Sequence, residues 1–433
     1  MDINSLIKNA GHTSLIDIQS DSVEAFKSND NVILYSKTGS GKTIAFLLSL
    51  LSKIDTNKSG VQAIILAPSR ELSLQIEEVF RSLKSGQKIT ICYGGHSMRT
   101  EENSLAESPS VVVGTPGRIC DHIERGNLLL DNCTFFTIDE FDKCLELGFS
   151  EEMSYIARKL PALKNRMLVS ATRMEEIPDY LHSNYHTLDR ISDDDEIAIQ
   201  EHLVKYDYDI VEALGTLLKS FGNERTIVFC NYREVSEDVS FQLEDHDVTS
   251  VFYHGGLEQD ERERALIKFR NGSSTVLVCT DLGARGLDIP DVMHIVHYQY
   301  PGSEEAFIHR KGRTARMSAN GHSYLFKGEN NQLPMYIQTP DSTIDLNLMV
   351  NDPVKPEWIT LYFSGGKKDK VNKIDIVGFL SKKGDLGKGE IGLITVQDRA
   401  CYVAVKSAKV KSVLAKIRGE KVKGKRLKIE ISK

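Results

Sequence analysis

The chain has 433 residues, 40% of them hydrophobic and 27% charged, with a net charge of −7. This composition excludes a disordered chain. The length exceeds what one ordinary folding core accommodates, so we predict two domains, or two with a smaller third. The seven cysteines form no CxxC pair or metal-ligand spacing, which excludes a disulfide framework and indicates reduced thiols in a cytoplasmic protein. Since we find no apolar run of eighteen residues and no secretory leader, we expect neither a membrane span nor secretion.

Short apolar and β-branched runs alternate with amphipathic stretches in the first part of the chain. Strands are predicted at residues 32–35, 63–66, 89–93, 111–113, 135–138 and 167–169, with helices such as 43–51 and 70–83 between several of them. The pattern stops near residues 190–196 and resumes with strands at 227–230, 248–253, 276–279 and 293–297. This alternation predicts an α/β fold with two parallel sheets, each covered on both faces. The predicted domains cover residues 1–195 and 196–328.

The remainder of the chain has a different organisation. Residues 329–355 show no sustained periodicity and are interpreted as a linker that could hold a short helix. Residues 356–433 are predicted to form strands at 358–363, 392–396, 402–405 and 426–431 and helices at 374–382 and 408–417. Their β-α-β-β-α-β order predicts a small α+β domain of the ferredoxin-like kind, which RNA-recognition modules share with many others.

Charge is unevenly distributed between these parts. From Lys367 to Lys433, 19 Lys and Arg residues face 7 Asp and Glu residues, a net of +12, so the rest of the chain carries −19. A basic module on an acidic body favours a nucleic acid or an acidic surface as a partner. A tail kept soluble by lysines is an alternative that charge alone leaves open.

A phosphate-binding loop is predicted where the first strand runs into YSKTGSGKT at residues 35–43. Glycines let the backbone wrap a phosphate, and the following helix offers N–H donors and positive potential. Lys42 can reach the outer phosphates, and the Thr43 hydroxyl can bind Mg²⁺. Ser36 replaces the first glycine of the GxxxxGK[ST] pattern, but the strand, loop and helix together argue against a chance match. The residues predicted to surround the phosphates are Ser36, Thr38, Gly39, Ser40, Gly41, Lys42 and Thr43.

Carboxylates follow another strand of the same domain, where FFTI at residues 135–138 runs into Asp139, Glu140, Phe141 and Asp142. Beside a phosphate loop, Asp139 would hold Mg²⁺, mainly through water, and Glu140 would orient or deprotonate an attacking water. Without such a loop, acids after a strand more often cap a helix or lie in solvent. The loop makes the metal interpretation the leading one.

The sequence DEFD at residues 139–142 resembles the DEAD motif of the DEAD-box RNA helicases, with Phe141 in the place of alanine. Other motifs similar to this family follow in its order: APSREL at 67–72, GG at 94–95, TPGR at 115–118, SAT at 170–172, TD at 280–281, RGLD at 285–288 and HRKGRTAR at 309–316. The resemblance implies two tandem RecA-like domains, ATP and Mg²⁺ as cofactors, and RNA-dependent ATP hydrolysis coupled to local duplex separation.

The resemblance also implies roles for arginines in the second domain. Arg313 and Arg316 would reach the triphosphate, with Arg316 as the arginine finger, and Asp288 would contact the ribose. A solvated basic helix face that includes Arg310 is the alternative, which would apply only without the other motifs. The predicted catalytic residues are Lys42, Asp139, Glu140, Arg313 and Arg316.

Two further groups follow from the resemblance. Ser170 and Thr172 would link Asp142 to the interface between the domains and so couple the ATP state to RNA binding. RNA would lie along backbone N–H groups and short side chains, which hold phosphates and riboses without reading sequence. The residues predicted to contact RNA in the two domains are Pro68, Arg70, Gly95, Thr115, Arg118, Gly255 and Thr280.

The adenine-reading segment departs from the family pattern. Residues 11–19 keep Gly11, Ile18 and Gln19 but lack both prolines and the aromatic residue. Gln19 can still pair with the adenine edge through the donor and acceptor of its amide. We predict weaker ATP affinity or relaxed base selectivity. Phe141 is the other departure, and we interpret it as a packing residue.

The last module resembles the RNA-binding domain of DbpA-like bacterial DEAD-box helicases, including GGKK at 365–368 and KVKGKR at 421–426. The resemblance implies a 23S ribosomal RNA hairpin in pre-50S particles as the partner. For Tyr362 and Tyr402, stacking on RNA and packing within the domain stay equal alternatives. The residues predicted to bind RNA here are Lys367, Lys368, Tyr402, Lys423, Lys425 and Arg426.

Three functional hypotheses remain open on the sequence. The leading one is an RNA-stimulated ATPase and helicase without an obligate protein partner. An RNA-structure clamp with decayed ATPase activity is the second, favoured slightly by Phe141 and the altered adenine segment. A DNA helicase is a distant third.

Overall fold

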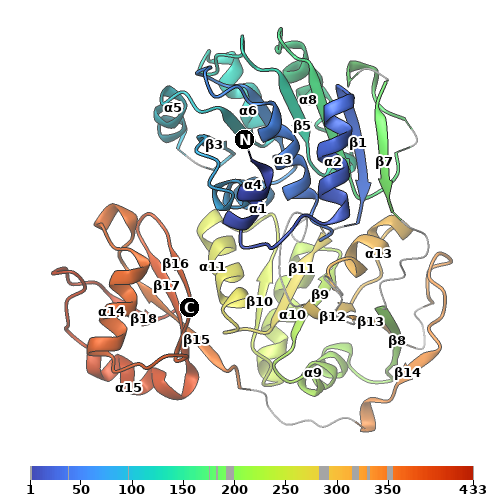
Figure 1. Cartoon of the computed structure of the whole chain (residues 1–433). Coiled ribbons are helices and arrows are strands. Elements are labelled where there is room, and N and C mark those ends of the chain that lie inside the picture. Colours follow the sequence, from blue (N-terminus) through green and yellow to red (C-terminus); the bar gives the residue numbers. More distant parts are fainter. Residues whose placement is uncertain are drawn as a thin grey trace. The chain divides into compact units, whose positions relative to one another are not determined.

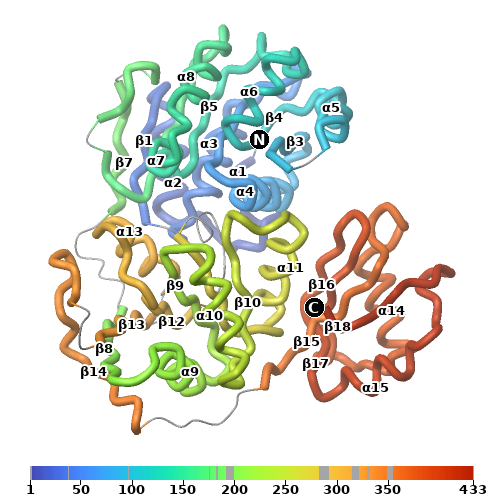
Figure 2. The backbone as a smooth tube through the Cα atoms, turned by 180° about the vertical axis from the view of Figure 1, so that it is seen from behind, coloured from blue at the N-terminus to red at the C-terminus, as the bar shows by residue number. Residues whose placement is uncertain are grey.

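The structure is a computed structural model that describes residues 2–37, 39–95, 97–174, 176–181, 184–191, 199–281, 292–314, 321–328, 332–348 and 355–432. The described residues up to 191 form one compact unit, and those from 199 onward form a second. Figure 1 shows their elements in the colours of the sequence, and Figure 2 shows the same backbone from behind.

The first unit contains a seven-stranded sheet in the order β3-β4-β2-β5-β6-β1-β7. All its neighbouring strands are parallel. The strands are β1 (Asn31–Ser36), β2 (Ala63–Leu66), β3 (Ile89–Cys92), β4 (Val111–Gly114), β5 (Phe135–Ile138), β6 (Asn165–Ser170) and β7 (His186–Arg190). Most of these strands are apolar on both faces, which is expected of parallel strands between two helical layers.

Helices cover both faces of this sheet (Figure 1). They are α1 (Ile3–Asn9), α2 (Asp17–Ser28), α3 (Lys42–Lys53), α4 (Arg70–Ser82), α5 (Met98–Ala106), α6 (Pro116–Glu124), α7 (Phe141–Glu146) and α8 (Ser150–Arg158), with a short 3-10 helix, η1 (Asp179–Leu181). Val32 and Leu34 of β1 pack in one core and Ile33 and Tyr35 in the other. Successive strand residues therefore serve opposite cores, as the period of two requires.

The second unit begins with another parallel sheet, in the order β10-β11-β9-β12-β13-β8-β14. Its strands are β8 (Ile199–Lys205), β9 (Arg225–Cys230), β10 (Ser250–Tyr253), β11 (Val276–Thr280), β12 (Val292–His297), β13 (Gly321–Lys327) and β14 (Ser342–Ile344). Its helices are α9 (Ile210–Ser220), α10 (Arg233–Asp245), α11 (Gln259–Arg270) and α13 (Glu304–Lys311), with the 3-10 helix η3 (Leu346–Leu348). It therefore repeats the architecture of the first unit.

The C-terminal module of the second unit is an antiparallel sheet in the order β16-β17-β15-β18. Its elements are β15 (Trp358–Phe363), η4 (Lys367–Asp369), α14 (Lys373–Lys383), β16 (Ile391–Val396), β17 (Cys401–Lys406), α15 (Ser407–Ile417) and β18 (Ile429–Ile431). Leu361 and Val403 on one sheet face pack against Ile376 of α14 and Val413 of α15. The predicted fold class, two parallel α/β domains and a small α+β domain, is confirmed.

The structure differs from the sequence-based elements at several places. The stretch predicted as a linker contributes β14, which pairs with β8. A three-residue edge strand is too short to show a period, and its pairing depends on the open edge of β8. The sequence also missed β7, β8 and β13, and β18 begins at Ile429 and not at residue 426. In the described part of the chain, no helix combines the length and apolarity needed to span a membrane.

Candidate active site

The motifs of the first unit converge because their strands end at the same edge of one parallel sheet. Tyr35 of β1 pairs with Ser170 of β6, and Leu66 of β2 pairs with Ile138 of β5. The phosphate loop, the acidic motif and the 170–172 segment therefore leave the sheet side by side. The parallel register of the strands provides this juxtaposition.

The phosphate loop joins β1 to α3. Gly39 and Gly41 have φ values of +82° and +88°, which glycine adopts without strain. The Lys42 ammonium donates to the backbone oxygen of Ser36 at 2.6 Å, and the Ser36 hydroxyl donates to Ser40 Oγ at 2.7 Å. Thr43 lies in the first turn of α3, while the predicted contact Thr38 lies outside the described residues. The loop thus holds the Lys42 ammonium against its own backbone.

Gln19 of α2 contacts this loop. A Cβ added to Gly41 would lie 3.0 Å from Gln19 Nε2 and 3.0 Å from Ile16 Cδ1. The Gln19 side-chain oxygen accepts a hydrogen bond from the Ile16 backbone N–H at 3.2 Å, and Gln19 is buried. The residue retained from the family's adenine segment is therefore fixed beside the phosphate loop.

Asp139 follows β5 and is buried. Desolvation raises its carboxyl pKa to about 7, although the positive charge of Lys42 opposes the rise. The Glu140 backbone N–H donates to Asp139 Oδ1 at 2.9 Å. Glu140 has a φ of +47°, a left-handed conformation that costs about 1–3 kcal/mol in a non-glycine residue. Among the described residues, Glu140 Oε2 is buried without a hydrogen-bond partner. The backbone therefore holds a buried acceptor that a water or a hydrated cation can satisfy.

Phe141 and Asp142 begin α7 and point to different surroundings. Phe141 is fully buried in a core with Ile138, Cys144 and Met153, which supports its interpretation as a packing residue. The Thr172 hydroxyl donates to Asp142 Oδ2 at 2.9 Å. The Ser170 hydroxyl donates to the Thr172 carbonyl at 2.7 Å and accepts from the Thr172 N–H at 3.2 Å. The structure brings this trio together, and its coupling role stays a prediction.

The predicted RNA residues of the first unit lie in three loops at the same sheet edge. Pro68 follows β2 and Arg70 begins α4, Gly95 follows β3, and Thr115 precedes α6, which contains Arg118. The Arg70 guanidinium lies 4.3 Å from the centroid of the Tyr93 ring. The sequence did not single out Tyr93, or Glu101 and His122, which join two of these loops.

In the second unit, Arg310 of α13 is almost completely buried, which excludes a solvated position for this side chain. Its guanidinium donates to both carboxylate oxygens of Asp281, to the Gln299 carbonyl at 2.7 Å and to Asn231 Oδ1 at 2.8 Å. It also lies over the Phe229 ring at 5.0 Å. Arg310 is therefore an internal link between the 280–281 and 309–316 motifs. Asn231, a polar residue directly after β9, was a signal that sequence reasoning overlooked.

Outside the C-terminal module, the other predicted residues that the structure describes in the second unit lie in or beside three different elements. Gly255 lies in the loop after β10, Thr280 ends β11, and Arg313 lies just beyond the end of α13. Asp288 and Arg316 lie outside the described residues. The predicted action of Arg313 and Arg316 on the triphosphate stays a prediction.

In the C-terminal module, the predicted lysines lie in surface segments. Lys367 and Lys368 form part of η4, and Lys423, Lys425 and Arg426 lie between α15 and β18. Lys423 pairs with Asp375 at 3.0 Å and Lys425 with Asp369 at 3.1 Å. Bound phosphates would have to compete with these exposed pairs, which are weak individually.

Tyr402 lies on the sheet face opposite the module's helices and is only 7% exposed. On the same face, buried Thr360 receives a hydrogen bond from Asn271 Nδ2 at 3.0 Å and shares one with Ser273 Oγ at 2.5 Å. Asn271 and Ser273 follow α11, so this face of the sheet is covered from within the second unit. In this arrangement Tyr402 has little surface for stacking, and its packing interpretation is favoured over RNA contact.

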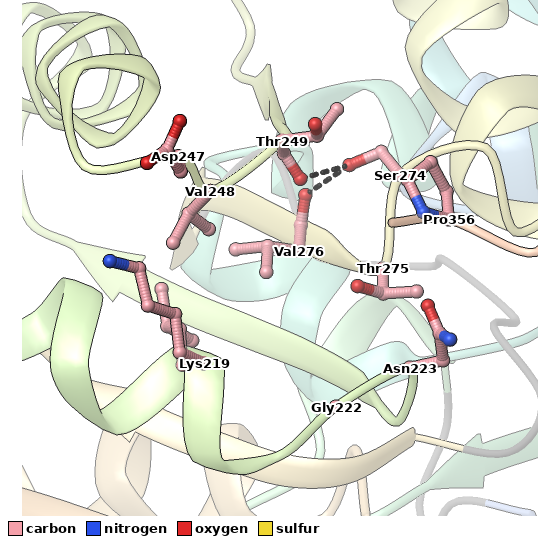
Figure 3. Close-up of a pocket in the computed structure, with 11 residues that line it drawn as sticks. Lys219, Gly222, Asn223, Asp247, Val248, Thr249, Ser274, Thr275, Val276 and Pro356 are labelled. Atoms are coloured by element: carbon pink, nitrogen blue, oxygen red, sulfur yellow. Dashed lines mark hydrogen bonds between the residues drawn. The ribbon is translucent and has the colours of Figure 1, made fainter. Parts of the chain in front are cut away.

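Figure 3 shows a cavity of about 20 Å³ in the second unit, which has room for about one water molecule. Lys219, Asn223 and Pro356 are among its lining residues. The Ser274 hydroxyl in its wall lies 3.1 Å from the Thr249 carbonyl and 2.9 Å from the Val276 carbonyl. The cavity is too small for a nucleotide and contains none of the motif residues.

Comparisons with known proteins agree with this site. The DEAD/DEAH box helicase family matches residues 16–179, the helicase conserved C-terminal domain matches 209–318, and the DbpA RNA binding domain matches 360–431. The ATP-dependent RNA helicase DbpA of Escherichia coli (strain K12) is 31% identical, over 98% of this chain and 95% of that protein. DbpA of Bacillus subtilis (strain 168) is 29% identical, over 99% and 97%. The structure of S. cerevisiae Dbp5 bound to RNA and ADP BeF3 is similar with a TM-score of 0.68 and 27% identity, over 76% of this chain and 87% of that one.

The chain therefore belongs to the DEAD-box ATP-dependent RNA helicases. Within that family it carries a DbpA-type RNA-binding domain after the two helicase domains. Its enzymatic class is an RNA-dependent ATPase and helicase, as the motifs predicted. The clamp and DNA-helicase alternatives are not supported by these matches.

Proposed function

We propose that this enzyme hydrolyses ATP at the carboxyl edge of the first sheet, with Glu140 orienting the attacking water. The observation that carries this proposal is the buried, unpartnered Oε2 of Glu140, held beside Asp139 by a left-handed backbone. Thr43 and Asp139 would hold Mg²⁺, which neutralises phosphate charge when bound. Lys42 would exchange the Ser36 carbonyl for the outer phosphates.

A deprotonated Asp139 suits this role. Burial raises the pKa of its carboxyl to about 7 while Lys42 lowers it, so a cation beside it would favour the charged form further. Arg313 and Arg316, from the second domain, would stabilise the transition-state charge, and Asp288 would contact the ribose. Because ATP and RNA would each engage both domains, each should tighten the binding of the other.

We propose further that the C-terminal module directs the enzyme to a hairpin of 23S ribosomal RNA during assembly of the 50S subunit. The net charge of +12 from Lys367 to Lys433 supports a polyanionic target. The seven cysteines, all unpaired in the described chain and six of them buried, support a reducing compartment such as the cytoplasm.

The Glu140→Gln variant tests the catalytic proposal. It keeps the side-chain shape but removes the base, so RNA-stimulated ATP hydrolysis should fall by about 10² to 10⁴ while ATP still binds. Glu146→Gln is the matched control, because Glu146 lies on the same short helix and pairs with Lys143. Its ATPase activity should be unchanged. If wild type and Glu140→Gln hydrolyse ATP equally slowly with RNA, the proposed role of Glu140 in hydrolysis is wrong. The hypothesis of an RNA-structure clamp is then favoured.

RNA targeting is tested by the affinity of the full chain for a 23S rRNA hairpin at several salt concentrations. Replacing Lys423, Lys425 and Arg426 with glutamine should weaken binding and reduce the salt slope by about 2, because each phosphate that a cation neutralises adds roughly 0.7 to the slope. The matched triple control replaces Lys409, Lys411 and Lys416 of α15 with glutamine. Equal weakening in the two triple variants would show that binding follows net charge and not the proposed loop. If the chain binds a hairpin of scrambled sequence as strongly as the 23S rRNA hairpin, the proposed RNA target is wrong.

A further inference from the structure

Two of the predicted RNA-contact segments of the first unit are joined by one buried carboxylate. Glu101 of α5 is 1% exposed. Its Oε1 accepts the backbone N–H of Tyr93 at 3.1 Å, directly before Gly94 and Gly95. Its Oε2 accepts from Arg118 Nε at 2.7 Å, in the first turns of α6. A single side chain therefore sets the spacing between the glycine loop after β3 and the N-terminal part of α6.

His122 completes this arrangement one turn further along α6. Its Nε2 lies 2.8 Å from Glu101 Oε2, and its Nδ1 lies 3.1 Å from the side-chain amide of Asn127. An amide nitrogen can only donate, so His122 Nδ1 accepts the hydrogen bond from Asn127. His122 Nε2 then carries the hydrogen and donates a hydrogen bond to Glu101. Among the described residues, the carboxylate thus accepts hydrogen bonds from the Tyr93 loop and from Arg118 and His122 of α6, which holds both elements in one geometry.

Tyr93 extends the connection to the third segment. Its ring is buried and lies beneath the Arg70 guanidinium at 4.3 Å from centroid to Cζ. A Cβ at Gly95 would lie 3.8 Å from Arg70 Nη1. The loop that Glu101 anchors through the Tyr93 N–H therefore also contacts the start of α4.

Glu101 is charged in this setting. Burial by itself would raise its pKa, but the hydrogen bonds from His122, Arg118 and Tyr93 together lower it below its ordinary value. Cys92 lies close enough that Cys92, Glu101 and His122 could share a metal among the described residues. Both oxygens of Glu101 are already engaged, one of them by the Arg118 cation, so the contacts favour an ion-pair network over a metal site.

We propose that Glu101 is a positioning residue for RNA, which fixes the glycine loop and α6 at the separation needed to grip successive phosphates of one strand. The proposal rests on the proposed RNA path through Gly95 and Thr115. Glu101 itself is buried and touches no RNA. Removal of the Glu101 carboxylate would let the glycine loop and α6 move apart, so RNA would bind more weakly. The phosphate loop would stay unaltered.

The test measures RNA-stimulated ATP hydrolysis by the full chain as a function of RNA concentration. Glu101→Gln should raise the RNA concentration for half-maximal stimulation by roughly tenfold, while kcat at saturating RNA changes less than about twofold. A general loss of folding would lower kcat and not the apparent RNA affinity. Thermal unfolding and ATP affinity are measured in parallel. Glu107→Gln is the matched control, because Glu107 is the C-cap residue directly after the same helix and forms an exposed pair with Lys88. This variant should behave as wild type.

Two further variants separate the possible failures. Thr115→Ala removes a predicted RNA contact without touching Glu101. His122→Leu removes one of the donors to Glu101, because leucine has no polar atom in its side chain, and it should have a smaller effect than Glu101→Gln. If Thr115→Ala weakens RNA binding and Glu101→Gln does not, the positioning role is wrong. If neither variant changes RNA affinity, the RNA path through this edge is wrong. If Glu101→Gln fails to fold, an unchanged apparent RNA affinity of His122→Leu overturns the proposal.

Discussion

The Arg310 guanidinium grips the Asp281 carboxylate with two parallel hydrogen bonds, Nε to Oδ1 at 2.6 Å and Nη2 to Oδ2 at 2.5 Å. The two residues belong to different motifs, separated by 29 positions in the chain. Arginine provides this planar fork and lysine does not. The first arginine of the 309–316 motif is therefore a structural residue that holds the start of the motif in place.

Asp281→Asn should destabilise the second unit by about 1.5–3 kcal/mol, because the buried guanidinium loses one charged acceptor. The measurement is the calorimetric unfolding transition of the second unit in the absence of ATP and RNA. Asp245→Asn changes an exposed acid at the end of α10 and should leave that transition within about 0.5 kcal/mol. Equal stability of Asp281→Asn and wild type would mean that the fork contributes nothing to folding.

Thr172→Val should separate ATP hydrolysis from duplex separation. The change keeps the side-chain shape and removes the hydrogen bond to Asp142, so ATP hydrolysis with RNA should stay within a few-fold while strands separated per ATP fall by roughly tenfold. Thr137→Val is the matched control: Thr137 lies in β5, and its buried hydroxyl has no hydrogen-bond partner among the described residues. A parallel decrease of both activities in Thr172→Val would contradict the coupling role.

Phe141→Ala should cost about 3–5 kcal/mol of stability, because it leaves a cavity in a closely packed core. Calorimetry can follow the transition of the first unit, which ATP should shift upward. Leu129→Ala removes a side chain that is 75% exposed in the same unit and should cost far less. Unchanged stability of Phe141→Ala would require the ring to have a role other than packing.

The second unit should lose stability as the pH falls below about 6.5, the usual pKa of histidine. Desolvation lowers the pKa of both His202 and His294; for His294 the Glu224 carboxylate opposes the shift. Above pH 6.5 these histidines are neutral in both states, so the stability is fully present. Below pH 6.5 the histidines bind protons in the unfolded chain, whereas in the folded chain they stay neutral until the pH reaches their lower pKa. Protonation therefore favours the unfolded state in this range.

His202→Gln tests this explanation. Glutamine can keep hydrogen bonds to His322 and Ser342, which His202 contacts at 3.0 and 2.9 Å, but it does not titrate. The unfolding temperature of the variant should fall less steeply between pH 6.5 and 5 than that of wild type. The same steepness in both proteins would exclude His202 as a source of the pH dependence.

Much of the fold and part of the site were predictable because they are local. Continuous apolar runs separated by amphipathic helices indicate parallel sheets, and the 35–43 sequence contains its own strand, loop and helix. The sequence also placed Asp139 and Glu140 at a strand end. It missed β7, β8 and β14, most of whose residues are exposed or partly exposed and show no clear period. It also missed β13, which is mostly buried.

The sequence by itself determined the motifs, their order and the chemistry each can perform, since residue types and short spacings suffice for that. Tertiary structure alone decided which of them meet. Gln19 reaches Gly41, Glu101 reaches Arg118, and Arg310 reaches Asp281. A sequence contains many possible donors and acceptors, and the strand order β3-β4-β2-β5-β6-β1-β7 selects the partners in the first unit. The physical reason is that parallel register fixes which strand ends are neighbours, and burial then removes water as the competing partner.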